Sequence, residues 1–328
     1  MIKNFWKSLC LALLILPGLM FSVVSANDLG SPAESRTMMS NDYDKLIDAA
    51  FPKYEGPALK AKFEAVVKKY PQGIDTIKVR SLGDIEKLLN LKTQQHAPEM
   101  KMFRQEDMAY DVHPEKGKVK FLRGVKQPMV LSKQAGMQRL PEFTRLHEDF
   151  LEKIGVPKDQ IFYKETSLLM SQSSTSPQEG SVRKNEPVVA GVSTYVVRAV
   201  DGIIVEGSSA KVTTLSDRGI DAVKLKWPRF RISPSIDNFE TKDRASLKSK
   251  IADRVRTIAG KGKANVKMAV VLLPVATGDS YDMVPVMKVA VMTENSGEGV
   301  IFYENLLKQE VEIEKPVSDQ ASGGPQNR

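Results

Sequence analysis

The feature that most constrains the fold is a repeated order, in which an amphipathic helical segment is followed by several strand segments. The first helical segment starts at about Leu140 and ends at Gly155, a residue type that favours the position just after a helix. Its apolar residues recur at helical spacing at Phe143, Leu146, Phe150, Leu151 and Ile154. Strand patterns follow at 161–170, 194–200, 203–205, 210–215 and 220–227. Asp201-Gly202 predicts a hairpin turn and Asp217-Arg218-Gly219 a further turn, because glycine tolerates positive φ.

The same order recurs nearer the C-terminus. Thr241 is the predicted N-cap of a second helix that Gly260 closes, with apolar residues at Leu247, Ile251, Val255 and Ile258. Strand patterns follow at 266–275, 283–293 and 300–303, with a turn at Gly297-Glu298-Gly299. The two units, 140–227 and 241–307, predict an α+β fold in which a helix lies across one face of an antiparallel meander in each unit.

The residues before the first unit predict short helices and then a strand pair. Helical spacing at 42–91 groups Tyr43, Leu46 and Ile47; Leu59, Phe63, Val66 and Val67; and Leu82, Ile85, Leu88 and Leu89, with Ser81 as an N-cap. Strand patterns at 102–104, 108–112 and 118–122 follow, the last two joined by the Pro/Gly turn 113–117. The apolar stripes of the helices are expected to face a core.

The N-terminal segment is typical of a secretory signal peptide. Lys3 and Lys7 precede an apolar run from Leu9 to Val24, and Val24-Ser25-Ala26 supplies the small residues of a cleavage site. We therefore expect cleavage after Ala26 and a secreted or periplasmic protein. The alternative is a retained anchor, which the shortness of the run and Pro17-Gly18 within it disfavour. No stable membrane insertion is expected after cleavage.

Cysteine usage and charge exclude several classes of function. Cys10 is the only cysteine and lies in the segment expected to be removed, so the exported chain would have no disulfide, cysteine nucleophile or thiolate metal site. Its position early in the apolar run disfavours lipidation. The net charge of +8 is mild for 328 residues, and lysines and arginines are interleaved with acidic residues. Basic runs with interleaved aromatics are missing, so no nucleic-acid partner is expected.

The expected organisation divides the chain into five segments. They are a signal peptide at 1–26, a helical N-terminal region at 27–99, an α+β unit at 100–232, a second α+β unit at 233–312 and a disordered tail at 313–328. Residues 27–40 are polar and are expected to form a mobile leader.

Residues 195–219 carry a resemblance to a known family. The run Tyr195-Val-Val-Arg-Ala-Val-Asp-Gly-Ile-Ile-Val-Glu-Gly, continuing to Asp217-Arg218-Gly219, resembles the propeptide region of thermolysin- and fungalysin-type metalloproteases and the related PepSY domains. The strand Asp282-Met-Val-Pro-Val-Met is similar to a strand of PepSY units. The resemblance covers about 140–307 and implies tandem cystatin/PepSY-like units. It also implies a role in assisting or inhibiting a protease.

The chain departs from those proteases at the residues that would perform catalysis. Their zinc motif is His-Glu-x-x-His, but here His147-Glu148 is followed by Leu151 where the second histidine should be. Gly191-Val-Ser193-Thr-Tyr195 lacks the final glycine of a serine nucleophile elbow. Gly260-Lys261-Gly262-Lys263 is interpreted as a helix terminus rather than a phosphate loop. No catalytic domain follows residue 307, and we assign no catalytic, cofactor-binding or metal-binding residue.

The remaining chemical candidates favour structural roles. His96 and His113 are expected at the surface and His147 at the edge of a core. The adjacent carboxylates Glu106-Asp107 and Glu148-Asp149 are expected in solvent. Methionines 283, 287 and 292 are interpreted as core filling, and a Met-rich copper or partner surface is the alternative. Trp227-Pro228-Arg229-Phe230 is expected to pack at a boundary between domains, the alternative being a peptide or glycan site.

The leading hypothesis is an exported, non-enzymatic protein that binds, inhibits or chaperones another exported protein, for which the resemblance implies a peptidase. An exposed sheet face or edge would supply the binding surface. The alternatives are an envelope scaffold or ligand-binding module, and an unrecognised hydrolase. A hydrolase would require one of the three histidines beside a serine or a carboxylate.

Overall fold

The computed structural model describes residues 39–52, 56–92, 96–97, 99–105, 107–175, 183–231, 240–277, 280–294 and 299–308. The expected signal peptide, residues 27–38, Glu106, the turn at 297–298 and the expected tail 313–328 lie outside the described residues. Within the described part of the chain, none of the helices has the length and apolar character needed to span a bilayer.

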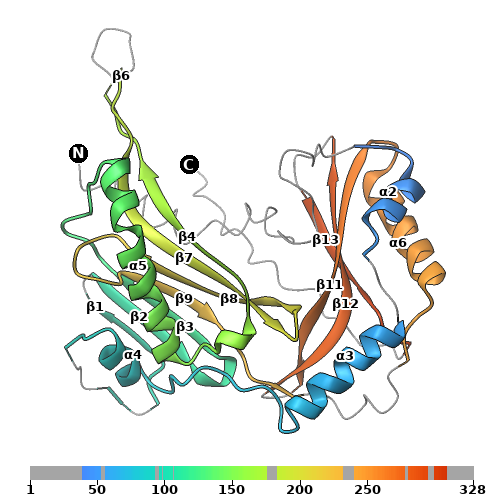
Figure 1. Cartoon of the computed structure of the whole chain (residues 1–328), viewed down its shortest axis with the longest axis horizontal. Coiled ribbons are helices and arrows are strands. Elements are labelled where there is room, and N and C mark those ends of the chain that lie inside the picture. The colour runs from blue at the N-terminus through green and yellow to red at the C-terminus, as the bar shows by residue number, and fades with distance from the viewer. Residues whose placement is uncertain are drawn as a thin grey trace, which may run out of the picture.

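The fold is α+β, as the pattern predicted, with five α-helices among the described residues and a large, mostly antiparallel sheet (Figure 1). The helices are α2 (Tyr43–Ala50), α3 (Gly56–Lys69), α4 (Leu82–Leu88), α5 (Lys133–Ile154) and α6 (Arg244–Ala259). The strands are β1 (Met102–Gln105), β2 (Met108–His113), β3 (Lys118–Arg123), β4 (Ile161–Ser171), β5 (Ser174–Thr175), β6 (Arg183–Lys184), β7 (Val188–Val200), β8 (Ile203–Thr214), β9 (Ala222–Lys226), β10 (Phe230–Arg231), β11 (Ala264–Thr277), β12 (Ser280–Thr293) and β13 (Gly299–Asn305).

Several local predictions are confirmed. Ser81 caps α4: its hydroxyl accepts a hydrogen bond from the Asp84 N–H, and the Asp84 carboxylate accepts one from the Ser81 N–H. Gly155 ends α5 with a φ of 93°, and Asp201 and Gly202 form the tight β7–β8 turn with φ values of 48° and 77°. The turn works because both residue types accept positive φ at low cost.

Other local predictions are corrected by the structure. Helix α5 begins at Lys133 rather than near Leu140, because Ser132 caps it and Pro141 is accommodated within it. Asp243, not Thr241, caps α6, since its carboxylate accepts hydrogen bonds from the N–H groups of Ala245 and Ser246. Thr241 instead forms a bridge with Leu307.

Ends of the strand segments also differ from the sequence expectation. Ser40, expected in a mobile leader, pairs with Ala264 beside β11 through backbone hydrogen bonds in both directions. The connection between β4 and β7, for which no strand was predicted, contains the two short strands β5 and β6, which pair with each other.

One sheet joins two portions of the molecule. The N-terminal portion contains β1, β2, β3, β9, β8, β7 and β4, and the C-terminal portion contains β11, β12, β13 and β10. The portions meet where β8 pairs in parallel with β11, at Val205 and Leu272. Neighbouring strands are otherwise antiparallel, except for the short β10–β12 pair.

Each portion buries one face of its sheet against helices. In the N-terminal portion, α4 and α5 cover a core that includes Val119, Val212 and Leu225. In the C-terminal portion, α2, α3 and α6 cover a core that includes Ile251 and Val289. The helices α2 and α3 thus pack against C-terminal strands more than 150 residues later in the chain.

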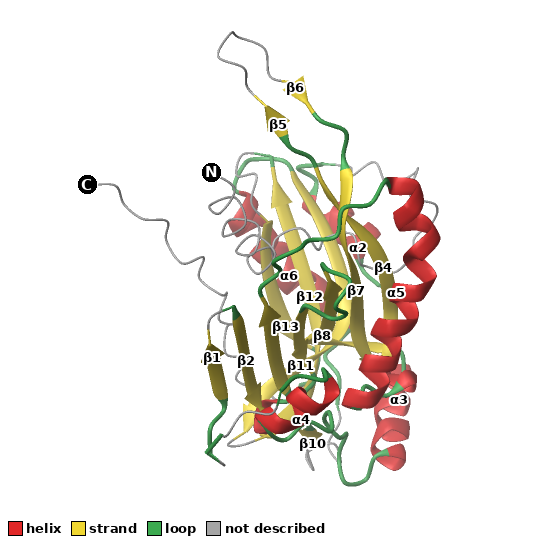
Figure 2. Ribbon diagram, turned by 90° about the vertical axis from the view of Figure 1, so that its left-hand side faces the viewer, coloured by secondary structure: helices red, strands yellow, loops and turns green. Residues whose placement is uncertain are grey.

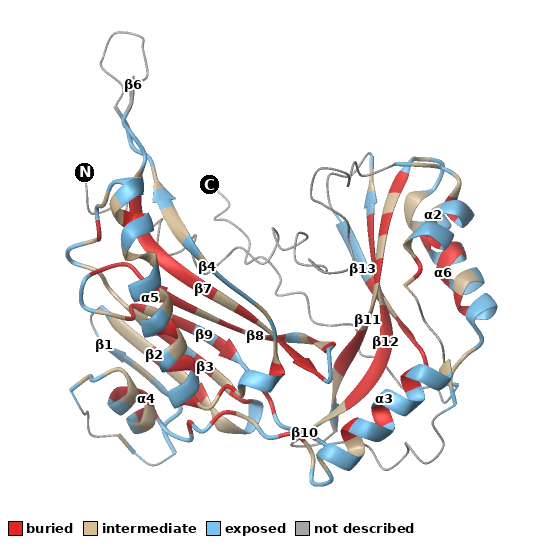
Figure 3. Ribbon diagram, viewed as in Figure 1, coloured by how far each residue is buried: buried red, intermediate tan, exposed pale blue. Residues whose placement is uncertain are grey.

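The helices lie on the outer sides of the molecule (Figures 1 and 2). The sheet faces that carry no helix are therefore turned toward each other. We call this surface the helix-free face. Figure 3 shows that β7 and β12 are buried along much of their length, whereas α5 and α6 expose their outer sides.

Strand β8 takes part in both cores. Ile203 and Val205 pack in the C-terminal core, whereas Ala210 and Val212 pack in the N-terminal core. Between them, Gly207 has a φ of 67°, and the β7–β8 register shifts between Val197 and Ala199. This irregularity changes the alternation of β8, so that Ile204 and Glu206 share the helix-free face with Ser209 and Lys211.

Candidate functional site

A row of lysines crosses the helix-free face of the N-terminal portion. In β3 and β9 the core residues Phe121 and Val223 alternate with Lys120 and Lys224, so these lysines point away from the helices. The same alternation in β8 turns Lys211 to this side. Strand alternation therefore places all three side chains on one surface.

The register brings these lysines directly opposite one another. Lys120 pairs with Lys224 across β3 and β9, and Lys224 pairs with Lys211 across β9 and β8. Like charges at directly opposite positions destabilise a sheet. Lys120, Lys211 and Lys224, which we call the lysine row, form no ion pair with any other described residue that the structure shows.

Lys211 is the electrostatically strained member of the row. Its side chain is partly buried, and burial lowers the pKa of its ammonium group. The neighbouring charge of Lys224 lowers that pKa further. An anion bound beside Lys211 would offset both effects, because a neighbouring negative charge favours the charged ammonium group.

Carboxylates close the row at both ends. In the same cross-strand line, Asp111 on β2 pairs with Lys120, and Glu165 on β4 pairs with Tyr195 beside Lys211. The Asp111 carboxylate contacts Nζ of Lys118 at 3.2 Å and Nε2 of His113 at 2.7 Å. The uncompensated positive charge is thus confined to three strands.

Tyr195 forms the aromatic end of the row. Its side chain is partly buried, and burial raises the pKa of its hydroxyl, against a hydrogen bond with Ser209 that lowers it. The charge of Glu206 raises this pKa further. Glu206 itself accepts hydrogen bonds from Nζ of Lys288 at 2.8 Å and from the hydroxyl of Tyr303 at 3.2 Å.

The histidines lie in more enclosed positions than the sequence suggested. His147 is fully buried, not at the edge of the core, and its ring nitrogens contact Oγ1 of Thr194 at 2.7 Å and of Thr214 at 3.0 Å. Burial lowers its pKa to about 4. Both ring nitrogens are therefore occupied, and Leu151 is a core residue rather than a ligand.

His96 is also mostly enclosed, contrary to the expectation of a surface histidine. Its Nε2 lies 2.7 Å from Oε1 of the buried Glu86, which also accepts a short hydrogen bond from the hydroxyl of Tyr110. Burial, followed by the contact with Glu86, raises the pKa of Tyr110. His113 contacts Asp111, so two histidines lie beside carboxylates, which is what the hydrolase alternative required. No serine joins either pair among the described contacts.

The described residues contain no group of three or more His, Cys, Asp and Glu side chains that could hold a metal ion. Glu148 pairs with Lys164 at the surface, as expected for a solvated carboxylate. Met283 and Met287 are core residues, but Met292 is 38% exposed, so the core interpretation is wrong for that residue.

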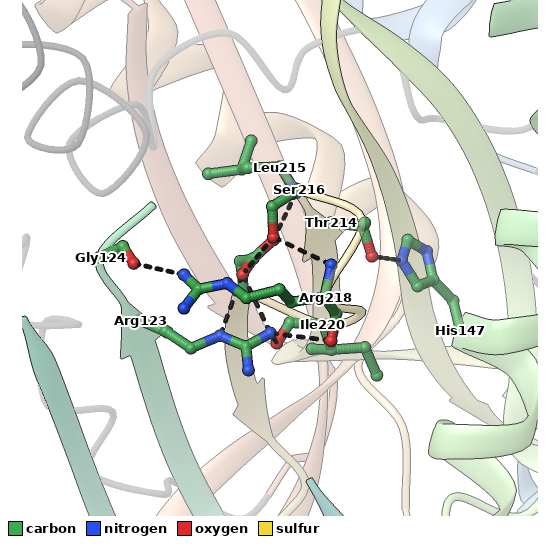
Figure 4. A network of polar contacts seen from close by, with 9 residues as sticks. Arg123, Gly124, His147, Thr214, Leu215, Ser216, Arg218 and Ile220 are labelled. Atoms are coloured by element: carbon green, nitrogen blue, oxygen red, sulfur yellow. Dashed lines mark hydrogen bonds and ion pairs between the residues drawn. The ribbon is translucent and has the colours of Figure 1, made fainter. Parts of the chain in front are cut away.

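The turn after β8 forms a structural polar network (Figure 4). The buried carboxylate of Asp221 accepts hydrogen bonds from the Leu215 N–H at 2.8 Å and from the Ser216 hydroxyl. Nε of Arg123 donates to the same carboxylate at 3.0 Å, and Arg218 donates to the Gly124 carbonyl at 2.8 Å. These contacts fix the turn that the sequence predicted at 217–219.

Arg198 is a buried cation at the junction of the two portions. Its guanidinium lies between the rings of Trp227 and Phe230, with centroid distances of 5.0 and 4.7 Å. It donates to Oε1 of Gln160 at 2.8 Å and to the carbonyls of Pro228 at 2.7 Å and of residue 75 at 3.1 Å. Trp227 and Phe230 are fully buried, so the predicted packing role is confirmed.

Sequence reasoning missed the lysine row. The available signal was the alternation of lysines with apolar residues at 118–121 and 223–226, which is typical of a strand with one solvent-exposed face. The charges were instead interpreted as scattered solvated residues. The pairing of β3 with β9, about 100 residues apart in the chain, is what brings these lysines together on one surface.

Comparisons with known proteins add little to this geometry. No family model and no curated protein matches the sequence. Among solved structures, the Bacillus megaterium YpeB C-terminal domain matches with 13% sequence identity and a TM-score of 0.26, covering 71% of this chain and 99% of that chain. A likeness of this size supports no argument about mechanism. The functional interpretation therefore rests on the helix-free face.

Proposed function

We propose that the chain is an exported, non-enzymatic protein that binds and restrains another exported protein through the helix-free face. The observation that carries this proposal is the lysine row, where three cations lie opposite one another and none forms an ion pair with a described residue. Charges in that arrangement cost stability in the free protein. A bound partner that supplies negative charge would offset this cost.

The propeptide-like pattern at 195–219 supports a peptidase as the partner. That pattern folds into part of β7, β8 and the turn that follows, so Tyr195 and Lys211 belong both to the resemblance and to the site. The contacts of His147 support a binding role over zinc hydrolysis, because threonine hydroxyls occupy both ring nitrogens. Export rests on the signal-peptide pattern at 1–26.

The test is affinity capture with the exported chain, residues 27–328, from the native envelope and culture supernatant. Proteins identified by mass spectrometry are then purified and titrated against the chain, both for complex formation and for inhibition of any peptidase activity. The proposal expects a complex that re-forms from the purified components. Recovery of no exported protein, together with neither complex nor inhibition when exported metalloproteases are titrated directly, would overturn it.

A matched pair of variants connects the result to the site. Lys120→Gln/Lys224→Gln changes two exposed members of the lysine row. Lys62→Gln/Lys68→Gln makes the same change in net charge on the exposed side of α3. Loss of the complex with the first variant only is expected. Equal loss with both variants would point to general charge attraction instead.

A further inference from the structure

The length of the positive stretch restricts what can bind there. The lysine row extends over β3, β9 and β8, and neighbouring strands are about 4.8 Å apart, so the three residues span about 10 Å. Asp111 and Glu165 then place negative charge at the two ends of the same line. An anionic polymer longer than this span would meet repulsion at both ends.

An extended acidic peptide of a few residues fits this span. In an extended chain, alternate side chains point to the same side about 6.7 Å apart, so three alternate carboxylates span about 13 Å. The long, flexible lysine stems can adjust by the few ångströms that separate the two spans. Three charges of each sign would then meet.

Partly buried apolar groups border the lysine row. Leu122 lies opposite Ala222 in the cross-strand line on one side. On the other side Val197 lies opposite Ser209, and the same line continues to Lys226 and Lys118. Tyr195 adds an aromatic ring and a hydroxyl at the end of the row. A peptide that carries apolar residues beside its carboxylates can use these surfaces, whereas a bare inorganic or sugar polyanion cannot.

The placement of the row disfavours large anionic surfaces. The helix-free faces of the two portions are turned toward each other, so the row lies on an inner side of the molecule (Figure 1). A flat bilayer or a nucleic-acid duplex needs an outward-facing patch, and phosphate recognition commonly uses the forked contacts of arginine rather than lysine alone. A single extended chain can enter where such surfaces cannot.

We propose that the lysine row binds a short, extended acidic segment of the partner protein, with carboxylates at alternate positions and apolar residues near them. This inference rests on the proposed function and specifies the chemistry of the partner. Binding converts the repulsion among Lys120, Lys211 and Lys224 into three attractive contacts. The partly buried Lys211 contributes most, because charge interactions strengthen where water is partly excluded.

The probe is a fluorescent peptide containing Glu-Val-Glu-Ile-Glu, a pattern that this chain itself carries at 310–314. Its control has glutamine at the three glutamate positions. Fluorescence anisotropy with the exported chain is expected to show binding of the acidic peptide alone, weakening as ionic strength rises. Polyphosphate and an anionic vesicle serve as competitors, and neither is expected to displace the peptide at equal charge concentration.

The two double variants described above supply the site test. Lys120→Gln/Lys224→Gln is expected to weaken peptide binding about tenfold or more, which corresponds to about 1.4 kcal/mol. Lys62→Gln/Lys68→Gln is expected to leave it within about twofold, the range of a remote surface charge. Thermal unfolding of each variant verifies that it folds. Because both substituted row lysines are exposed, the core remains intact.

The outcomes separate this inference from the proposed function. If the acidic and glutamine peptides bind alike, if both double variants weaken binding equally, or if polyphosphate binds in preference, the acidic-segment inference is overturned. If affinity capture still gives a stable protein complex in that case, the proposed function stands. Peptide binding at the row without any protein partner would support the chemistry but overturn the restraining role.

Discussion

Acidification should weaken the fold through His147. Its imidazole is fully buried, and its pKa falls from 6.5 to about 4 because burial penalises the charged form. Between these values the unfolded chain takes up a proton that the folded chain does not. The stability associated with neutral His147 is therefore complete above about pH 6.5 and is lost as the pH falls toward 4.

The magnitude follows from the difference between the two pKa values. A difference of one pKa unit corresponds to about 1.4 kcal/mol, so the complete loss is about 3 kcal/mol. Between pH 7.5 and 4.5 the linkage relation gives a loss of about 2–3 kcal/mol in the free energy of unfolding from this residue. Urea unfolding at the two pH values, monitored by circular dichroism, measures it.

Two variants isolate the imidazole from other titrating groups. His147→Gln removes the titration while keeping a side chain that can donate and accept, so its loss between the two pH values should be about 2–3 kcal/mol smaller than that of the wild type. Thr214→Val removes the 3.0 Å contact but keeps the imidazole, so its loss should match the wild type. If His147→Gln loses as much stability as the wild type, the reasoning is wrong.

Three further substitutions test other parts of the structure by urea unfolding. Lys224→Glu should raise the free energy of unfolding by about 0.5 kcal/mol, since it removes repulsion in the lysine row. The control is Lys62→Glu on α3. If both variants change the free energy of unfolding equally, this account is wrong. Arg198→Ala should lower the free energy by about 3 kcal/mol, because three oxygens lose a buried donor; a loss below about 1 kcal/mol would show that they find other partners. Asp221→Ala should cost about 3 kcal/mol, and a tolerated substitution would mean that the turn is held by other contacts.

Local structure was largely predictable because it depends on residues close in the chain. The Asp201-Gly202 turn, the Ser81 cap and the Gly155 helix end each follow from the conformational preference of one or two residues. The start of α5 was missed because its first two turns carry little of the apolar stripe. Gly136 within those turns packs closely against Val189, where a Cβ atom would approach to 2.7 Å.

Long-range arrangement was not predictable from the same information. The packing of α2 and α3 on the C-terminal portion depends on contacts that no local pattern encodes. The candidate site has the same origin, because Lys120 and Lys224 become neighbours only when β3 pairs with β9. In the sequence each lysine is indistinguishable from an ordinary solvated residue. Only the neighbouring strand places a second lysine opposite it.

Sharing one strand between two cores has a consequence for how the molecule comes apart. Separating the C-terminal portion would expose Ile203 and Val205 to solvent, while Ala210 and Val212 of the same strand would stay packed in the N-terminal core. It would also remove Phe230 from the ring pair that encloses Arg198. Neither portion can unfold without exposing apolar groups and a cation of the other. We therefore expect the two portions to unfold in a single cooperative transition.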